Sequence, residues 1–179
     1  MNILSIEHGR TAYHADFALY GTAVLGLGAW LALRAPAPQR LELAAWVGAG
    51  VVAWSPIEYA LHRFVLHGVQ PFKRWHLQHH RHPTALISTP TVVSAALFGA
   101  GVWLPARWWL GIWVADAFTL GLLIGYLAYA TTHHALHHWQ SDMRWLQNRK
   151  YWHARHHHLL QPCCFGVTSG FWEIGRAYV

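Results

Sequence analysis

Residues 108–138 read WWLGIWVADAFTLGLLIGYLAYATTHHALHH, an apolar run that passes directly into paired histidines. The part from 108 to 132 contains one acid, Asp116. It is long enough to cross a hydrocarbon core as a helix, which takes about 20 residues. Histidine is the commonest metal ligand among side chains. This stretch therefore predicts a membrane helix that carries metal ligands at its end.

Three further apolar runs precede this one, at residues 17–33, 43–57 and 91–104. We expect the second run to stay helical past Pro56 as far as His67, and the third, which is short for a span, to stop at Pro105. The sequence therefore predicts an all-α fold. We expect an integral membrane four-helix bundle with a cytoplasmic helical cap carrying a histidine-rich di-metal site, in a single domain over residues 1–179.

The composition supports a membrane protein, with 54% hydrophobic residues, 12 Trp and only 11% charged residues. Soluble proteins have about 25% charged residues. Basic residues outnumber acidic ones, and they flank the apolar runs instead of forming one polar face. The negatively charged partner that we expect is therefore anionic lipid and not nucleic acid. The N-terminus has no basic region leading into an apolar one, so no cleavable signal peptide is expected.

The basic residues also predict an orientation. Four crossings would place both histidine stretches and both termini on one side of the membrane. Basic residues on that side are Arg10, Arg63, Lys73, Arg74, Arg81, Arg144, Arg149, Lys150, Arg155 and Arg176, and the opposite loops hold Arg34, Arg40 and Arg107. By the positive-inside rule, the histidines and both termini are expected on the cytoplasmic side.

Histidine spacing favours two metal ions. Of the 16 histidines, all but His8 and His14, which we interpret as structural, fall within residues 62–82 and 133–158. Histidines three or four apart share a helix face, and the pairs of this kind are His76 with His79, His133 with His137, and His153 with His156. Adjacent histidines, and histidines five apart such as His62 and His67, diverge on an α-helix. Nitrogen-rich ligation of this kind suits iron, zinc or copper.

The histidine boxes, in this order between apolar runs, resemble the fatty acid hydroxylase superfamily of membrane di-metal enzymes, which includes sterol desaturases and carotenoid hydroxylases. The segments most similar to the fatty acid 2-hydroxylase branch are Trp54-Ser-Pro-Ile-Glu58-Tyr-Ala-Leu-His62-Arg-Phe-Val-Leu-His67, Tyr151-Trp-His153-Ala-Arg-His156-His157 and Phe165-Gly-Val-Thr-Ser169, with Phe171-Trp172. The resemblance covers residues 54–179.

The resemblance implies a membrane oxygenase that hydroxylates the acyl chain of a fatty acid or lipid with O₂ and two iron ions, although zinc could occupy the sites in the isolated protein. It implies that His62, His76, His79, His153 and His156 bind one ion, and that His67, His80, His133, His137 and His157 bind the other. The helix-face argument supports this division. No His-Pro-Gly-Gly haem segment is present at the N-terminus, so we expect a separate electron donor, cytochrome b5-like or ferredoxin-like.

Other residues are expected to support the site. Candidates for orienting the ligating imidazoles are Glu58, His82, His134, His138 and His158. Candidates for holding a carboxylate or headgroup are Arg63, Lys73 and Arg74. Asp116 could serve as a relay or substrate contact, or could simply be hydrated near the membrane surface. Pro162-Cys163-Cys164 has no functional interpretation, and the two adjacent cysteines do not easily meet the geometry of a disulfide with each other.

Two other functions remain open. Hydroxylation or desaturation of a sterol or carotenoid would use the same histidines, and the sequence barely separates it from attack on an acyl chain. A metal transporter or sensor could also carry histidine-rich cytoplasmic segments, but transport sites normally lie at membrane depth among polar residues, which the apolar runs here almost lack. A haem electron carrier would need paired histidines within the bundle and is disfavoured.

Overall fold

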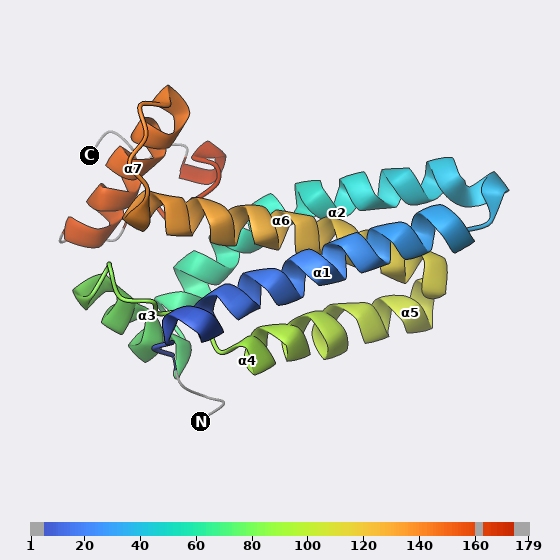
Figure 1. Ribbon diagram of the computed structural model, residues 1–179, viewed down its shortest axis with the longest axis horizontal. Helices are drawn as coiled ribbons and strands as arrows, with labels where there is room; N and C mark the ends of the chain where they lie inside the picture. The colour runs from blue at the N-terminus through green and yellow to red at the C-terminus, as the bar shows by residue number, and fades with distance from the viewer. Residues whose placement is uncertain (1–5, 160–162, 174–179) are drawn as a thin grey trace. The chain divides into compact units, whose positions relative to one another are not determined.

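A computed structural model describes residues 6–159 and 163–173 of the chain, and its regular elements are helices (Figure 1). The fold divides into two compact units. Unit 1 consists of Met1–Trp54 and Ser88–Leu127, and unit 2 of Ser55–Ile87 and Ala128–Val179. Helices α2 (Arg40–Ala60) and α6 (Ile112–His138) each contribute residues to both units. The expectation of an all-α protein is confirmed.

Unit 1 is built from four helical segments. In chain order its elements are α1 (Arg10–Arg34), the 3₁₀ turn η1 (Ala37–Gln39), the first part of α2, the run of α4 (Thr91–Ala96), η3 (Leu97–Trp103) and α5 (Leu104–Leu110), and the first part of α6. The buried core between them contains Leu31, Ala35, Leu43, Ala117 and Leu120. Leu31 and Ala35 lie at the end of α1, Leu43 lies in α2, and Ala117 and Leu120 lie in α6. The core therefore joins three of the four segments.

The sequence had suggested that the third apolar run stops at Pro105, but the structure shows that it does not. Helical structure continues from Thr91 to Leu110, and Pro105 lies in the first turn of α5, directly after the π-helical segment η3. Proline is tolerated at that position because a first-turn N–H has no partner within its own helix. The break comes instead at Gly111, whose φ of 82° ends α5. Consequently α6 begins at Ile112 and not at Trp108.

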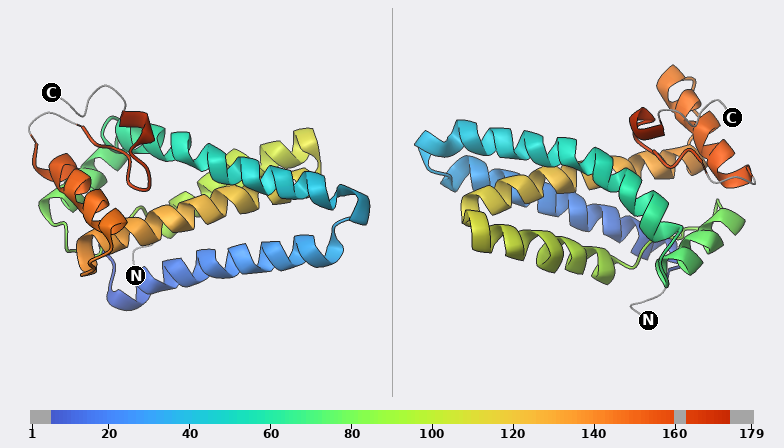
Figure 2. Two further views of the ribbon diagram at one scale, coloured as in Figure 1. Left: turned by 90° about the horizontal axis from the view of Figure 1, so that it is seen from above. Right: turned by 180° about the vertical axis from the view of Figure 1, so that it is seen from behind.

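Helices α2 and α6 approach each other closely within unit 1, as two views of the ribbon show (Figure 2). A Cβ atom on Gly50 would lie 2.4 Å from the backbone oxygen of Phe118. One on Gly121 would lie 2.1 Å from the backbone oxygen of Val47. Only glycine fits at these two positions. Small residues that let helix backbones touch are typical of helix pairs in membranes.

Asp116 is not simply hydrated near the membrane surface, which was one of the two roles that its sequence position suggested. It is 5% exposed, and its two carboxylate oxygens accept hydrogen bonds from the indole N–H groups of Trp30, at 3.1 Å, and Trp103, at 2.7 Å. The three residues come from α6, α1 and η3. Since a buried carboxylate must be paired, this contact holds three segments of unit 1 together.

Two helices within the described residues are long and apolar enough to cross a membrane, α1 and α6. In the apolar window of α1 only 6% of the residues are buried within the protein. Large apolar side chains of unit 1 are correspondingly exposed, among them Leu25, Leu33, Val52, Trp108 and Trp109. An exposed apolar surface of this extent is typical of contact with lipid or with another protein.

Unit 2 carries all of the histidines except His8 and His14. Its elements are the last part of α2, the π-helical segment η2 (Leu61–Leu66), α3 (Phe72–Arg81), the last part of α6, α7 (Arg144–His158) and the 3₁₀ turn η4 (Phe171–Glu173). A small core of Ala135, Leu136, Leu146 and Val167, with Tyr129 against it, joins the end of α6, α7 and the segment after α7. This packing fixes the ends of the helices that supply the histidines.

Candidate metal centre

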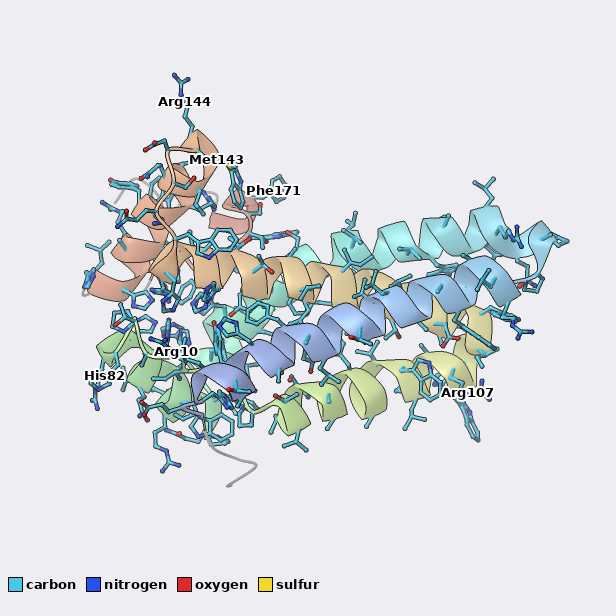
Figure 3. The ribbon with its side chains drawn as sticks, viewed as in Figure 1. Arg10, His82, Arg107, Met143, Arg144 and Phe171 are labelled. Atoms are coloured by element: carbon cyan, nitrogen blue, oxygen red, sulfur yellow. The ribbon has the colours of Figure 1, made fainter. Side chains whose placement is uncertain are left out.

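Ten histidines of unit 2 converge in two groups, and the ring nitrogens that each group offers lie within 4.8 Å of one another. Group 1 consists of His62, His67, His76, His80 and His156. Group 2 consists of His79, His133, His137, His153 and His157. The nitrogen atoms gather between α3, the end of α6 and α7 (Figure 3). These are the ten histidines that the sequence analysis singled out.

The two groups adjoin each other. The rings of His80, in group 1, and His157, in group 2, stack with centroids 4.1 Å apart. Where two adjacent histidines both belong to these groups, they belong to different ones, as His79 with His80 and His156 with His157 show. Both α3 and α7 therefore supply ligand candidates to both groups. Two ions held by these nitrogens would be close neighbours.

The division between the groups differs from the expected one because four-residue spacing prevails over three-residue spacing. On α3 the Nε2 atoms of His76 and His80 lie 3.0 Å apart, and on α7 those of His153 and His157 lie 3.1 Å apart. At 100° per residue, a spacing of four returns to within about 40° of the same direction, whereas a spacing of three misses it by about 60°. His79 consequently belongs to group 2, apart from His76 and His80, and His156 belongs to group 1, apart from His153 and His157.

His62 and His67 share group 1 although they are five residues apart. On an α-helix they would diverge, but residues 61–66 form a π-helix, in which hydrogen bonds run from residue i to i+5. That wider turn brings residues five apart to one side. The ring centroids of His62 and His67 lie 5.4 Å apart as a result. Short π-helical segments often occur at functional sites.

Distances between the facing nitrogens match those of a coordination sphere. The Nε2 atoms of His62 and His76 lie 3.0 Å apart, and those of His137 and His153 lie 2.8 Å apart. A metal ion bound at ~2.1 Å by two imidazoles at right angles separates their nitrogens by about 3.0 Å. Neither ring nitrogen of the buried His79 has a hydrogen-bond partner among the described residues. Since buried polar atoms are normally paired, these nitrogens fit ligands of a metal ion.

Backbone carbonyl groups orient two of the histidines in group 1. Nδ1 of His62 lies 2.6 Å from the carbonyl oxygen of Phe165, and Nδ1 of His156 lies 2.7 Å from that of Cys163. A carbonyl can only accept, so each Nδ1 carries the proton and each Nε2 presents a lone pair to the group. Sequence reasoning missed these partners, because a backbone carbonyl leaves no mark on residue identity.

Glu58 fixes the segment that supplies one of these carbonyls. The carboxylate, 3% exposed, accepts hydrogen bonds from the N–H groups of Val167, at 2.8 Å, and Thr168, at 2.9 Å, and from the Thr168 hydroxyl, at 2.5 Å. The Glu58 carboxylate thus anchors a local hydrogen-bond network. Through Phe165 the same network reaches His62.

Burial favours the neutral form of His62, His67 and His79 by lowering the pKa of each. Burial, followed by the charges of His156 and Lys73, lowers the pKa of His67 to about 4. Burial also lowers the pKa of His79 to about 3, and it lowers that of His62 well below the ordinary value of 6.5. A neutral imidazole offers a lone pair, so at neutral pH no proton competes with a metal ion for these nitrogens.

The other candidate histidines lie outside both groups. His82 is exposed at the end of α3 and projects outward (Figure 3), and His158 is exposed at the end of α7. His134 stacks on His138 along α6, with ring centroids 4.5 Å apart. None of the four contributes a nitrogen to the two groups.

The basic candidates differ in their surroundings. The guanidinium of Arg63 donates to the Tyr59 hydroxyl at 2.5 Å and lies over the rings of Phe64 and Phe165, 5.2 and 5.8 Å from their centroids. Phe165 also contacts the rings of group 1, so Arg63 stands directly beside that group. Lys73 and Arg74 are exposed on α3.

The amino-acid sequence is similar to those of known proteins. The model of the family described as fatty acid hydroxylase matches residues 47–175. The dihydroceramide fatty acyl 2-hydroxylase FAH2 of Arabidopsis thaliana is 33% identical over 138 residues, which cover 71% of this chain and 57% of that protein. The fatty acid 2-hydroxylase of Macaca fascicularis is also 33% identical, over 69% of this chain and 36% of that protein.

A solved structure shows the same fold. The chain aligns with the visible hydroxylase domain of full-length scs7p with a TM-score of 0.74 and 25% identity, covering 90% of this chain and 64% of that one. The ceramide very long chain fatty acid hydroxylase SCS7 of Saccharomyces cerevisiae is 34% identical over 145 residues. The chain thus spans between about one third and three fifths of the relatives' length.

Proposed function

Because the chain belongs to the fatty acid hydroxylase family, we propose that it is an oxidoreductase that uses O₂ to hydroxylate the acyl chain of a fatty acid or of a lipid such as a ceramide. The observation that carries this proposal is the pair of adjoining five-histidine groups in unit 2. The relatives' names, fatty acid 2-hydroxylase and dihydroceramide fatty acyl 2-hydroxylase, favour attack at the carbon next to the acyl carbonyl.

We propose that the ten histidines hold two iron ions, one in each group, and that zinc could replace iron in the isolated protein. Iron bound there would supply O₂ activation and hydrogen abstraction from an unactivated C–H bond, which side chains alone do not perform. The overall reaction consumes O₂, two electrons and two protons, puts one oxygen atom into a C–H bond and releases the other as water. A separate electron carrier protein would deliver the electrons.

We propose that the protein is a multi-pass membrane protein, with unit 1 forming a four-helix membrane bundle and units 1 and 2 acting as one domain over residues 1–179. The exposed apolar surface of α1 and the tryptophans Trp108 and Trp109, 85% and 80% exposed, support contact of unit 1 with lipid. The distribution of basic residues supports a cytoplasmic location for the histidines and both termini.

We propose that Arg63 binds the carboxylate or polar headgroup of the substrate, with Lys73 and Arg74 as outer contributors. Arg63 supports this role best because its guanidinium already stands beside Phe165 at the edge of group 1. Holding the acyl end there would bring the adjacent carbon toward the metal ions. The exposed His82, His138 and His158 and the partly buried His134 are proposed to surround the site without binding the ions.

Lipid analysis of expressing cells tests the proposal. Cells that express the protein should accumulate hydroxylated fatty acids or hydroxylated ceramides, and cells that express His137→Ala should not, because that change removes a group 2 nitrogen. The matched control is His14→Ala, an exposed histidine on α1 outside both groups, which should retain the product. Changed sterols or carotenoids with unchanged acyl chains would contradict the proposal.

Metal analysis of the purified protein provides a second test. The protein should retain about two ions per chain, one for each group. An active protein with one ion or none would rule out the dinuclear site. Tightly bound metal without any hydroxylated product would instead favour the sensor or transporter interpretation.

A further inference from the structure

Two cysteines lie directly behind the metal-binding nitrogens of group 1. Cys163 and Cys164 follow α7 in unit 2, and their Sγ atoms are 2.9 Å apart. Cys163 is half-buried and Cys164 is 5% exposed. The carbonyl oxygen of Cys163 accepts the hydrogen bond from His156 that turns Nε2 of this histidine toward group 1.

The backbone at this pair is already unusual. Cys164 has a positive φ of 61°, the left-handed conformation that few residues other than glycine adopt. Such conformations are energetically unfavourable and cluster at functional sites. Here the conformation accompanies the approach of two thiols, which would need to close by a further distance of about 0.9 Å to form an S–S bond of ~2.05 Å.

A disulfide between the two cysteines would act directly on the carbonyl that orients His156. The ring closed by the S–S bond contains both Cα atoms, both Cβ atoms, both sulfurs, the carbonyl carbon of Cys163 and the nitrogen of Cys164. Neighbouring Cα atoms are ~3.8 Å apart across a trans peptide, whereas disulfides prefer about 4.4–6.8 Å. Closing the ring must therefore move this peptide, and the strain makes the bond easy to reduce.

We propose that Cys163 and Cys164 form a reversible oxidation site, whose disulfide turns the Cys163 carbonyl away from His156 and weakens metal binding by group 1. The coupling to metal rests on the proposed function of group 1, whereas the oxidation site itself does not. In a reducing cytoplasm the thiol form would prevail, and oxidative conditions would switch the enzyme to a state that holds its metal less tightly.

Hydrogen peroxide is the class of oxidant that balances the step. The half-buried thiol of Cys163 attacks one peroxide oxygen, and the sulfur becomes a sulfenic acid while the other oxygen leaves with the thiol proton as water. The Cys164 thiol then attacks the sulfenic sulfur, forms the S–S bond and releases a second water. Two thiols and one peroxide thus become one disulfide and two waters. Reduction by a dithiol reverses the change.

The test uses the full-length protein loaded with zinc, which does not react with peroxide itself. Each protein is measured before and after peroxide treatment, and again after addition of dithiothreitol. Mass spectrometry of the peptide that contains both cysteines detects the loss of two hydrogen atoms, and chelator competition measures zinc retention. Phenylarsine oxide, which bridges two neighbouring thiols, provides a probe of the reduced pair.

We expect peroxide to form the disulfide and to lower the affinity of one of the two zinc ions by about 10-fold, the usual effect of losing a partner of a metal-bound imidazole. Dithiothreitol should restore the affinity, and phenylarsine oxide should bind the untreated protein and block the oxidation. Cys164→Ser and, independently, Cys163→Ser should keep the same zinc affinity with and without peroxide. Both variants retain the backbone carbonyl.

Three results would overturn the inference: no disulfide in the intact protein, a disulfide without any change in zinc affinity, or an equal loss of zinc in the serine variants. The outcome is separable from that of the proposed function. A protein that responds to peroxide as expected but produces no hydroxylated lipid would refute only the function. One that hydroxylates lipid but never forms the disulfide would refute only this inference.

Discussion

Glu58 is the residue on which the segment after α7 depends most. Its carboxylate accepts hydrogen bonds from three donors of Val167 and Thr168, and all of them would lose their partner in Glu58→Ala. We expect this change to lower the free energy of unfolding by about 3 kcal/mol, because buried donors without partners are costly. It should also loosen one bound metal ion, because the Phe165 carbonyl that orients His62 belongs to the same segment. Thermal unfolding and chelator competition measure the two effects.

The matched control for this prediction is Glu42→Ala, which removes an exposed acid in the first turn of α2. It should change the unfolding free energy by no more than about 0.5 kcal/mol. Glu58→Gln keeps the shape of the side chain and one good acceptor, so its metal affinity should lie between those of the intact protein and of Glu58→Ala. Equal metal affinity in all of these proteins would show that Glu58 does not position His62.

The division of the histidines makes a separate prediction. His76 and His80 share group 1, and His79 belongs to group 2. Replacing His76, His80 or both by alanine should lower the metal content from about two ions to about one, since one site is lost in each case. Replacing His76 and His79 together should remove both ions. Elemental analysis of the purified variants measures this, and a content of about one ion in the His76/His79 double variant would favour the alternative division.

Individual residues differ in how well the sequence predicts their place. The 14 clustered histidines stand out by residue type and spacing, and the resemblance to the fatty acid hydroxylase superfamily selected ten of them as ligands. Their division could not be predicted, since it depends on whether a helix turn is α or π and on which spacing prevails. The carbonyls of Phe165 and Cys163 were unpredictable in principle. Asp116 was predictable as unusual, but its two indole donors are 86 and 13 residues away.

Helix contacts in unit 1 depend on two glycines, and α2 offers a built-in comparison. Gly50→Ala would place a Cβ atom 2.4 Å from the backbone oxygen of Phe118 on α6. We expect it to destabilise the protein by about 2 kcal/mol, because two backbones would have to separate. At Gly48, on the same helix, nothing lies within 4 Å of an added Cβ.

Gly48→Ala is therefore expected to leave stability unchanged or to raise it by up to about 1 kcal/mol, the helix propensity difference between alanine and glycine. Thermal unfolding in the same detergent compares the two variants. Equal midpoints for Gly50→Ala and Gly48→Ala would show that the close approach of α2 and α6 does not stabilise the protein.

Helical elements were predictable from apolar runs, but their ends were not. The run ending at Pro105 suggested a stop, because proline normally terminates a helix from within. Instead, the π-helical segment ends at Trp103, and Pro105 lies in the first turn of α5, so helical structure continues to Leu110. Sequence periodicity assumes 3.6 residues per turn and therefore misplaces residues wherever a π-helical segment intervenes. The same reason explains why His62 and His67 were expected to diverge.

For the whole molecule, the buried histidines predict a loss of stability in acid. Burial lowers the pKa of His67 to about 4 and of His79 to about 3 in the folded protein, whereas both titrate near 6.5 in an unfolded chain. Below pH 6.5 the unfolded chain therefore binds protons that the folded protein does not. Unfolding becomes more favourable as the pH falls from 6.5 toward 4, and this penalty is absent above 6.5.

We accordingly expect the melting temperature of the metal-free protein to fall between pH 7 and pH 5, and bound metal to be released over the same interval. Thermal scans at several pH values, with and without metal, measure both. His14→Ala, in α1 and outside both groups, should show the same profile as the intact protein. A melting temperature that stays constant or rises toward pH 5 would contradict this prediction.

On α3, His79 and His80 belong to different groups, and on α7 the same holds for His156 and His157. An ion bound by one group would therefore also fix the position of helices that carry ligands of the other group. The first ion to bind would order both helices, and the second would find its ligands already arranged, at a lower entropic cost. Loading should therefore be cooperative. Native mass spectrometry during a metal titration should show metal-free and fully loaded chains with few singly loaded ones, and a protein short of metal would divide into inactive and complete molecules instead of accumulating half-built sites.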